Sequence, residues 1–191
     1  MSNGIHIVKR NGTKEPININ KIHKVVMHAC EGLAGVSASQ IEMNANLQFY
    51  DGMSTSEIQE IMVRSANDLI SLDSPNYQYA AARLLTYGLY KEVFGQFDAM
   101  PFIDIIKNNI SRGVYDAEIL EKYTEEEIAR LDNYIHHKRD ENFTYAGMRQ
   151  VVDKYLCQDR SSGEIFETPQ YMYMMIAATL FANYPKETRM H

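Results

Sequence analysis

Residues 7–22 read IVKRNGTKEPININKI, and the organisation of the whole chain can be developed from this segment. Asn11 and Gly12 form the commonest two-residue β-hairpin turn, because both residue types tolerate positive φ angles. Apolar and polar residues alternate before the turn, and a second short strand is expected at about residues 14–17. The sequence therefore predicts a β-hairpin that leads directly into a helix.

The predicted helix begins after Asn18 or Asn20, either of which can cap it. Its apolar residues follow the 3.6-residue helical period: Ile22, Val25, Val26, Ala29 and Leu33. The hairpin and the helix start also carry a local group of cations, opposed only by Glu15: Lys9, Arg10, Lys14, Lys21 and Lys24. This positive charge stands out because the chain as a whole is acidic.

Lys9, Arg10 and Lys21 can converge on one anion, because a tight hairpin brings its strands together and the helix starts one loop later. Guanidinium and ammonium groups bind phosphate oxygens through charge-assisted hydrogen bonds. A helix N-terminus adds unpaired N–H groups and a favourable dipole. The pattern predicts a polyphosphate site. A solvated basic hairpin edge, charged to prevent strand aggregation, is an equally open interpretation.

Glu15 and Asn18 are candidates to contact a nucleoside, because a carboxylate accepts from ribose hydroxyls and an amide both donates and accepts at a base edge. Their simpler roles are a salt bridge within the hairpin for Glu15 and a helix N-cap for Asn18. Thr55, near a helix start, and Lys91, near a helix end, can close the same site from other elements. Each of these two, taken alone, is more often a structural or solvated residue.

The composition bounds the remaining possibilities. The chain has 191 residues, 45% of them hydrophobic, which is enough to bury a core in one large or two small domains. A formal net charge of -6 argues against broad nucleic-acid binding. No signal-peptide pattern precedes the hairpin, and the longest apolar segment, residues 171–184, falls short of a membrane span. That segment is expected to be a buried helix, and the protein to be cytoplasmic.

The fold class expected is mainly α. Up to about residue 95, the pattern predicts the hairpin and four helices, the third with a capping box from Ser54 to Glu57. Further helices are expected beyond residue 100, among them residues 125–139, which a second capping box starts. Residues 143–156 are expected to turn from helix to strand. A second short hairpin is predicted across the turn at 161–163, followed by a long apolar helix through Phe181. Residues 185–189 are expected to start another helix that is cut short, so the chain is expected to be a fragment of a larger protein.

Other residues that could carry chemistry have plainer interpretations. Adjacent histidines such as His136 and His137 point to different faces of a helix, so the pair is interpreted as solvated surface and no metal site is predicted. Cys30 and Cys157 lie far apart and have no basic neighbour in sequence, which favours semi-buried thiols over nucleophiles. The tyrosine-rich stretches are interpreted as packing residues with satisfied hydroxyl groups rather than as a radical relay.

Taken together, several segments of the chain resemble, in order, the ATP-cone that opens the large (α) subunit of class I ribonucleotide reductases and the helical region that follows it. The resemblance covers the entire chain without large gaps. The segments that carry it are VKRNGTKEPININKI at 8–22, FYDGMSTSEI at 49–58, SPNYQYAAARLL at 74–85, FGQF at 94–97, YDAEILEKYTEEE at 115–127, FTYAG at 143–147, KYLCQDRSSGEIFETPQYMY at 154–173 and NYPKETR at 183–189.

The resemblance implies an ATP-cone over residues 1–95 and, over residues 96–191, a helical region that stops before a catalytic α/β barrel. It implies an effector site for ATP or dATP, with Mg²⁺ on the triphosphate, that switches overall activity. The residues it places around the nucleotide are Lys9, Arg10, Lys21 and Lys91 on the triphosphate, Glu15, Ile17 and Asn18 around the base and ribose, and Thr55 beside them. Position 59 departs from the best-known bacterial members, in which a histidine helps to sense the sugar; here it is Gln59, whose amide can also hydrogen-bond a hydroxyl.

The family's reaction makes deoxyribonucleotides from ribonucleoside diphosphates by thiyl-radical chemistry on the downstream barrel. Neither cysteine matches the catalytic positions, so no catalytic residue is assigned and the piece alone is predicted to be inactive. The partners implied are the remaining catalytic part of the large subunit and a radical-generating small (β) subunit, in a homodimer or larger assembly, without nucleic acid or membrane. Two alternatives remain: a free-standing nucleotide-sensing or adaptor module, and an interaction module whose cone binds no nucleotide.

Overall fold

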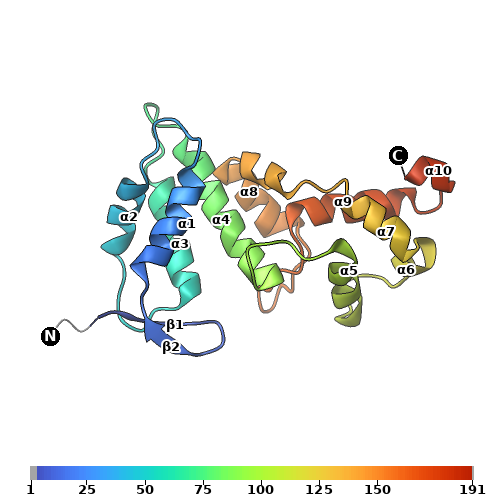
Figure 1. The fold of residues 1–191 in the computed structure, drawn as a ribbon, viewed down its shortest axis with the longest axis horizontal. Coiled ribbons are helices and arrows are strands. Elements are labelled where there is room, and N and C mark those ends of the chain that lie inside the picture. Colours follow the sequence, from blue (N-terminus) through green and yellow to red (C-terminus); the bar gives the residue numbers. More distant parts are fainter. Residues whose placement is uncertain (1–3, 191) are drawn as a thin grey trace. The chain divides into compact units, whose positions relative to one another are not determined.

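The computed structural model describes residues 4–190 and is mainly helical, with a two-stranded antiparallel sheet at the N-terminal end (Figure 1). The mainly α fold predicted from sequence is confirmed. The chain divides into two compact units. The first contains the chain through Gly88 together with Glu141–Arg149; the second contains Leu89–Asp140 and the chain from Gln150 onward.

The predicted hairpin is present. Strands β1 (His6–Val8) and β2 (Lys14–Pro16) pair with Ile7 opposite Glu15. Gly12 has a φ of 80° in the turn, a conformation that a residue without Cβ adopts at little cost. The hairpin also contacts the start of a helix from the same unit, because the Val8 N–H donates to the Met53 carbonyl at 2.9 Å. The local sequence signal and a longer-range contact therefore fix the hairpin together.

Helices of the first unit pack around a buried apolar core. They are α1 (Ile19–Cys30), α2 (Ala38–Asn46), α3 (Thr55–Asn67), α4 (Tyr77–Phe94) and α8 (Tyr145–Gln150). The last turns of α4 fall in the second unit. The capping box predicted at the start of α3 is confirmed, since the Ser54 side chain accepts from the Glu57 N–H and the Glu57 carboxylate accepts from the Ser54 N–H. Hydrogen bonds from this box and from the Tyr50 hydroxyl lower the pKa of Glu57 to about 2.

The second unit has its own core, which includes Phe102, Ile106, Ile128 and Tyr171. Its elements are α5 (Phe102–Ser111), α6 (Glu118–Lys122), α7 (Glu125–Asp132), the 3-10 helix η1 (His137–Asn142), the π-helix η2 (Val151–Tyr155), α9 (Pro169–Phe181) and α10 (Lys186–Arg189). The end of η1 continues into the first unit, and η2 begins directly after α8. The long apolar helix and the short helix after it start where the sequence predicted.

A helix over residues 125–139 was the wrong prediction. Helix α7 ends at Asp132, and a 3-10 helix begins at His137. The Asp132 carboxylate accepts the Phe102 N–H at 3.2 Å and so caps α5. The chain beyond Asp132 then tightens, because the Ile135 N–H donates to the carbonyl of Asp132, three residues earlier, at 3.0 Å. Asp132 lies thirty residues after the N–H group that it binds, so no local sequence pattern indicated that α7 would end there.

The second predicted hairpin is reduced to a single bridge between Gln158 and Ile165. The backbone groups that would extend it are used elsewhere. The Phe166 carbonyl accepts from the Asn109 amide at 2.9 Å, and the Cys157 N–H, which would pair with that carbonyl, donates to the Glu167 carboxylate at 2.8 Å. Within residues 143–156 the predicted turn from helix to strand is absent, because residues 145–155 pass directly from α8 into the π-helix.

Two expectations about burial were also wrong. His137 is not solvated surface: it is half-buried, and its ring lies edge-on to Tyr90 and Tyr171, with centroids 6.1 and 4.8 Å away. Burial lowers the pKa of His137. Helix α9 is not buried on all sides, because Ile176 and Leu180 are exposed while Tyr171 is fully buried. The apolar sequence of α9 therefore does not match the burial that the described chain provides.

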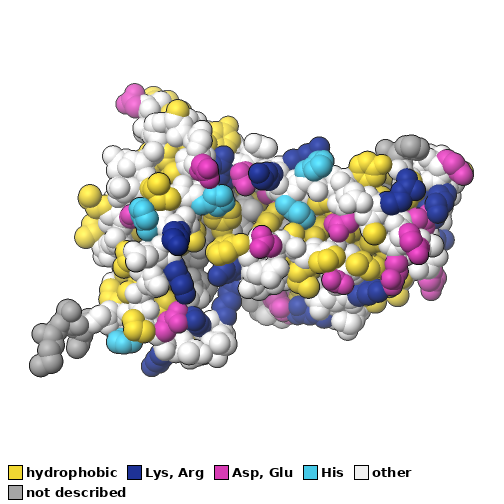
Figure 2. Space-filling view, in the orientation of Figure 1, with side chains coloured by type: hydrophobic (Ala, Val, Ile, Leu, Met, Phe, Trp, Pro, Cys, Tyr) yellow, Lys and Arg dark blue, Asp and Glu magenta, His cyan; other side chains and the backbone are white. Residues whose placement is uncertain are grey.

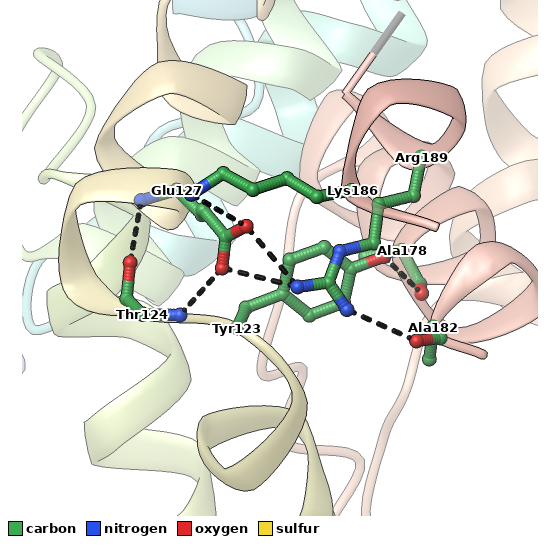
Figure 3. Close-up of polar contacts among 7 residues, drawn as sticks. All are labelled: Tyr123, Thr124, Glu127, Ala178, Ala182, Lys186 and Arg189. Atoms are coloured by element: carbon green, nitrogen blue, oxygen red, sulfur yellow. Dashed lines mark hydrogen bonds and ion pairs between the residues drawn. The ribbon is translucent and has the colours of Figure 1, made fainter. Parts of the chain in front are cut away.

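A cluster of charged residues ties α10 to α7 (Figure 3). The Glu127 carboxylate is almost fully buried and accepts two hydrogen bonds from Arg189, at 3.1 and 3.2 Å. It also pairs with Lys186 at 3.3 Å and accepts the Thr124 N–H at 2.9 Å. Burial would raise the pKa of Glu127, but the Thr124 N–H and the two cations lower it below its usual range. The ionised carboxylate therefore fixes the position of α10.

Within residues 4–190, no helix has both the length and the apolar character needed to cross a membrane.

Candidate functional site

A cavity of about 490 Å³ lies at the junction of the hairpin and α1. It is formed by the end of β2 and the first turn of α1, with Glu15, Pro16, Ile17, Asn18, Ile19, Asn20 and Lys21 as its lining. Its volume is in the range of small-molecule pockets. Four residues predicted to contact a nucleotide, from Glu15 to Lys21, thus line one cavity.

Asn18 positions the helix that forms one wall of this cavity. Its side-chain oxygen accepts the Lys21 N–H at 3.1 Å, which is the N-cap bond predicted from sequence. The amide nitrogen of Asn18 is a donor that can face a ligand in the cavity. Ile17 is half-buried, and its N–H donates to the Ile5 carbonyl at 2.8 Å, which holds the backbone beside the cavity.

Lys9 and Glu15 form an ion pair across the hairpin, with Nζ and Oε2 2.7 Å apart. The hydrogen bond from Lys9, together with the charges of Lys9 and Lys21, lowers the pKa of Glu15. Lys9, Glu15 and Lys21 therefore lie close together. Exposed pairs of this kind contribute little to stability, so Lys9 can exchange the carboxylate for a phosphate at little cost.

Arg10 points from the hairpin turn to α4, where its guanidinium donates to the Gly88 carbonyl at 3.5 Å. Gln59 of α3 approaches the same point, because a Cβ on Gly88 would lie 2.9 Å from the Gln59 Cγ. The Gln59 amide also donates to the Leu84 carbonyl at 2.5 Å. Gly88 thus makes room for Gln59 and binds Arg10.

The remaining predicted residues are placed less directly. Thr55 is the first residue of α3 and is half-buried. It follows Ser54, which bridges to Val8 of the hairpin. Lys91 falls in the second unit, where it is exposed and its Nζ lies 4.3 Å from the centre of the Phe97 ring.

The charge around the cavity matches an anionic ligand. Figure 2 shows Lys and Arg side chains gathered over the hairpin and the neighbouring part of α1. Glu15 is the one acidic residue among those that line the cavity. In the described part of the chain, no group of three or more His, Cys, Asp or Glu side chains is arranged to hold a metal ion. The arrangement can bind and position a polyphosphate, while its groups offer no activated nucleophile.

The cysteines do not add reactive groups. Burial raises the pKa of Cys30 to about 11. Partial burial and the neighbouring Glu167 carboxylate raise the pKa of Cys157 to about 11 as well. Both thiols are therefore protonated at neutral pH. Cys30 is half-buried, as the sequence predicted, whereas Cys157 is exposed.

Gly88 is the residue of this region that the sequence reasoning missed. A single glycine in the middle of an otherwise apolar helix is a weak signal for a close packing contact. That signal was present at position 88, but its partner Gln59 lies 29 residues earlier on another helix and could not be identified from spacing.

Comparisons with known proteins identify relatives of both parts of the chain. Residues 5–92 match the ATP cone domain, and residues 141–191 match the ribonucleotide reductase all-alpha domain. The chain is 47% identical over 190 residues to ribonucleoside-diphosphate reductase 1 subunit alpha of Escherichia coli strain K12, and 46% identical over 190 residues to the subunit alpha of Haemophilus influenzae. It is 40% identical over 189 residues to the subunit alpha of Enterobacteria phage T4.

These alignments cover 98 to 100% of this chain and 25% of each relative. The chain therefore spans about a quarter of the length of the curated relatives it matches. Both matched domains occur in the order expected from the sequence. The chain thus carries an ATP cone domain followed by a ribonucleotide reductase all-alpha domain, and along its whole length it is similar to ribonucleoside-diphosphate reductase alpha subunits.

Proposed function

We propose that this chain is the regulatory part of a ribonucleoside-diphosphate reductase large subunit and binds ATP or dATP as an allosteric effector in the cavity between the hairpin and α1. The observation that carries the proposal is that Glu15, Ile17, Asn18 and Lys21 line this one cavity. The match of residues 5–92 to the ATP cone domain supports it. The whole regulatory domain is taken as residues 1–95, and residues 96–191 as the helical region that joins it to the rest of the enzyme.

In the proposed complex, Lys9, Arg10 and Lys21 bind the triphosphate, with Lys91 as a further cation and Mg²⁺ on the phosphate oxygens. Lys9 leaves Glu15 to do so, and Glu15 then accepts from the ribose or the base. Asn18 and Ile17 contact the base, while Thr55 and Gln59 approach the sugar from α3. The effector is held by charge and shape, and no bond in it is broken.

Isothermal titration with ATP and dATP tests this site. Lys9→Ala and Arg10→Ala should each weaken binding about 10- to 100-fold, because a hydrogen bond to a charged group contributes about 1.5 to 3 kcal/mol. Lys14→Ala is the matched control: it removes an exposed lysine from the same hairpin, and it should leave affinity unchanged. Equal affinities for all four proteins, or no binding by the wild type, would contradict the proposal and favour a cone that binds no nucleotide.

The reaction itself is proposed to need two further components in a cytoplasmic assembly: the catalytic remainder of the large subunit and a radical-generating small subunit. Neither Cys30 nor Cys157 matches the catalytic positions of that family, so the chain alone should reduce no ribonucleoside diphosphate. Turnover should appear when the three components are mixed and should respond to ATP and dATP. Turnover by the chain alone would refute the assignment, and a mixture that is active but indifferent to the effectors would refute the regulatory role.

A further inference from the structure

We propose that the outward face of α9 is a docking surface for an α-helix of the polypeptide that carries the rest of the reductase large subunit. The proposal rests on the proposed function, and it assigns the surface through which this chain joins its catalytic partner. The surface is defined here as the α9 seam: Tyr173, Ile176 and Leu180, continued by Tyr184.

The sequence of α9 does not match its burial. Residues 169–181, PQYMYMMIAATLF, contain no charged side chain. A helix that is apolar on every side is normally buried on every side. In the described chain, Tyr171, Met172 and Ala178 are buried, whereas the seam residues have exposed fractions of 46% for Tyr173, 50% for Ile176, 69% for Leu180 and 54% for Tyr184. A partner that covers the seam accounts for the mismatch.

The spacing of the seam identifies the kind of partner. Tyr173, Ile176 and Leu180 are separated by three and then four residues, which is the spacing of the contact line between two packed helices. A strand or an irregular loop would not follow such a line. An α-helix with its own apolar stripe fits the seam.

A groove beside the seam is already formed. Its volume is about 630 Å³, and its apolar lining includes Ile119 of α6 and Met172, Met175 and Ile176 of α9. Lys122 of α6 donates to the Asn183 side chain at 2.9 Å, which links the two walls. Methionine side chains adapt to the shape of what they pack against. A bulky apolar side chain of the docked helix can therefore enter the groove.

The rim of the groove favours a basic flank on that helix. Asp116 and Glu118 lie on the lining, opposed by Lys122, which pairs with Glu118 at 3.5 Å. The excess acidic charge at this rim attracts lysine or arginine.

The relatives supply the occupant. Each is about four times as long as the matched region, so about three quarters of such a subunit lies outside it and can supply the docked helix. A second copy of this chain is the competing occupant. It would have to present the same acidic rim, which two copies would bring together unfavourably.

Co-expression tests the proposal. The tagged 191-residue chain is expressed with the three quarters of the E. coli relative that lie outside the matched region, and the two are co-purified. We expect the wild-type chain to co-elute with the partner. Ile176→Asp and Leu180→Asp should each reduce the amount of co-purified partner at least 10-fold, and Leu180→Gln should reduce it less. Leu72→Asp is the matched control, since Leu72 is also exposed but lies in the other unit. Circular dichroism should show unchanged helix content in all variants.

The proposal is overturned if the wild-type chain captures no partner, or if the seam variants capture it as well as Leu72→Asp does. It is also overturned if the chain alone sediments as a dimer that Leu180→Asp disperses, because the second copy would then be the occupant. Titration of Leu180→Asp with ATP separates the two proposals: its affinity should equal that of the wild type. Failed docking with normal ATP binding refutes only the seam.

Discussion

At the scale of single residues, the contact between Gly88 and Gln59 determines how α3 and α4 meet beside Arg10. Gln59 reaches the Leu84 carbonyl only because position 88 has no side chain. Glycine inside a helix costs about 1 kcal/mol relative to alanine. The structure therefore gives up helix stability at this position and gains the Gln59 contact.

A double-mutant cycle measures this coupling. Gly88→Ala in a Gln59→Ala background should stabilise the protein by about 1 kcal/mol, because only the helix propensity changes. In the wild type the same substitution should give no gain or a net loss, since the new Cβ displaces Gln59 from the Leu84 carbonyl. Urea unfolding of the four proteins gives the coupling free energy, and a value near zero would show that the two residues do not interact.

Asp140 is a buried carboxyl group whose titration should affect stability. Burial raises its pKa to about 6 from the usual 3.8 of an aspartate, although the Gln170 amide at 2.8 Å and the Tyr90 hydroxyl at 2.9 Å favour the ionised form. Because the folded-state pKa lies above the unfolded one, the folded state binds the proton more tightly. This contribution to stability is complete below about pH 4 and is lost as the pH rises through 6.

Asp140→Asn isolates that contribution. The free energy of unfolding of the wild type, relative to this variant, should fall by about 2 to 3 kcal/mol between pH 4 and pH 7. Asp153→Asn, at an exposed position, serves as the control and should follow the wild type. Chemical denaturation at a series of pH values provides the test; a flat difference between wild type and Asp140→Asn would mean that Asp140 ionises normally.

At the scale of elements, local patterns predicted the starts of helices better than their ends. Both capping boxes, at Ser54 and Thr124, are present because their partners lie three residues away. The Asn18 cap was predicted for the same reason. The end of α7 was not, because the Asp132 carboxylate binds a backbone group 30 residues distant. The second hairpin was overestimated because the side chains of Asn109 and Glu167 bind backbone groups that would have paired its strands.

In the candidate site, too, residues placed by local sequence could be predicted, while those placed by contacts between distant elements could not. The residues from Glu15 to Lys21 lie within one stretch of sequence, so their convergence on a cavity could be predicted from the hairpin and the cap. The position of Arg10 against Gly88 depends on the packing of α4 on the hairpin, which has no signature in the sequence.

The tie between α7 and α10 should contribute measurably to stability. Glu127→Gln removes the charge that Arg189 and Lys186 share, in a nearly buried position. We expect a loss of about 2 to 4 kcal/mol in the free energy of unfolding. Glu126→Gln, one residue earlier and exposed, should leave the free energy of unfolding almost unchanged. Equal losses for the two variants would mean that the tie does not hold α10 in solution.

At the scale of the whole molecule, function depends on how charge is distributed rather than on its total. The chain has a net charge of -6, yet cations gather at the hairpin and α1. An anion is therefore attracted to one place on an otherwise acidic protein. The α9 seam is the opposite kind of surface, apolar and uncharged, and suits a macromolecular partner rather than a charged effector.

A crystal structure of the chain grown with saturating dATP is the most direct test of the nucleotide site. The account predicts dATP in the cavity between Glu15 and Lys21, with Lys9 moved from Glu15 to the triphosphate and with Arg10 and Lys21 within hydrogen-bonding distance of phosphate oxygens. An empty cavity, with Lys9 still paired to Glu15 and Arg10 still bound to the Gly88 carbonyl, would contradict it.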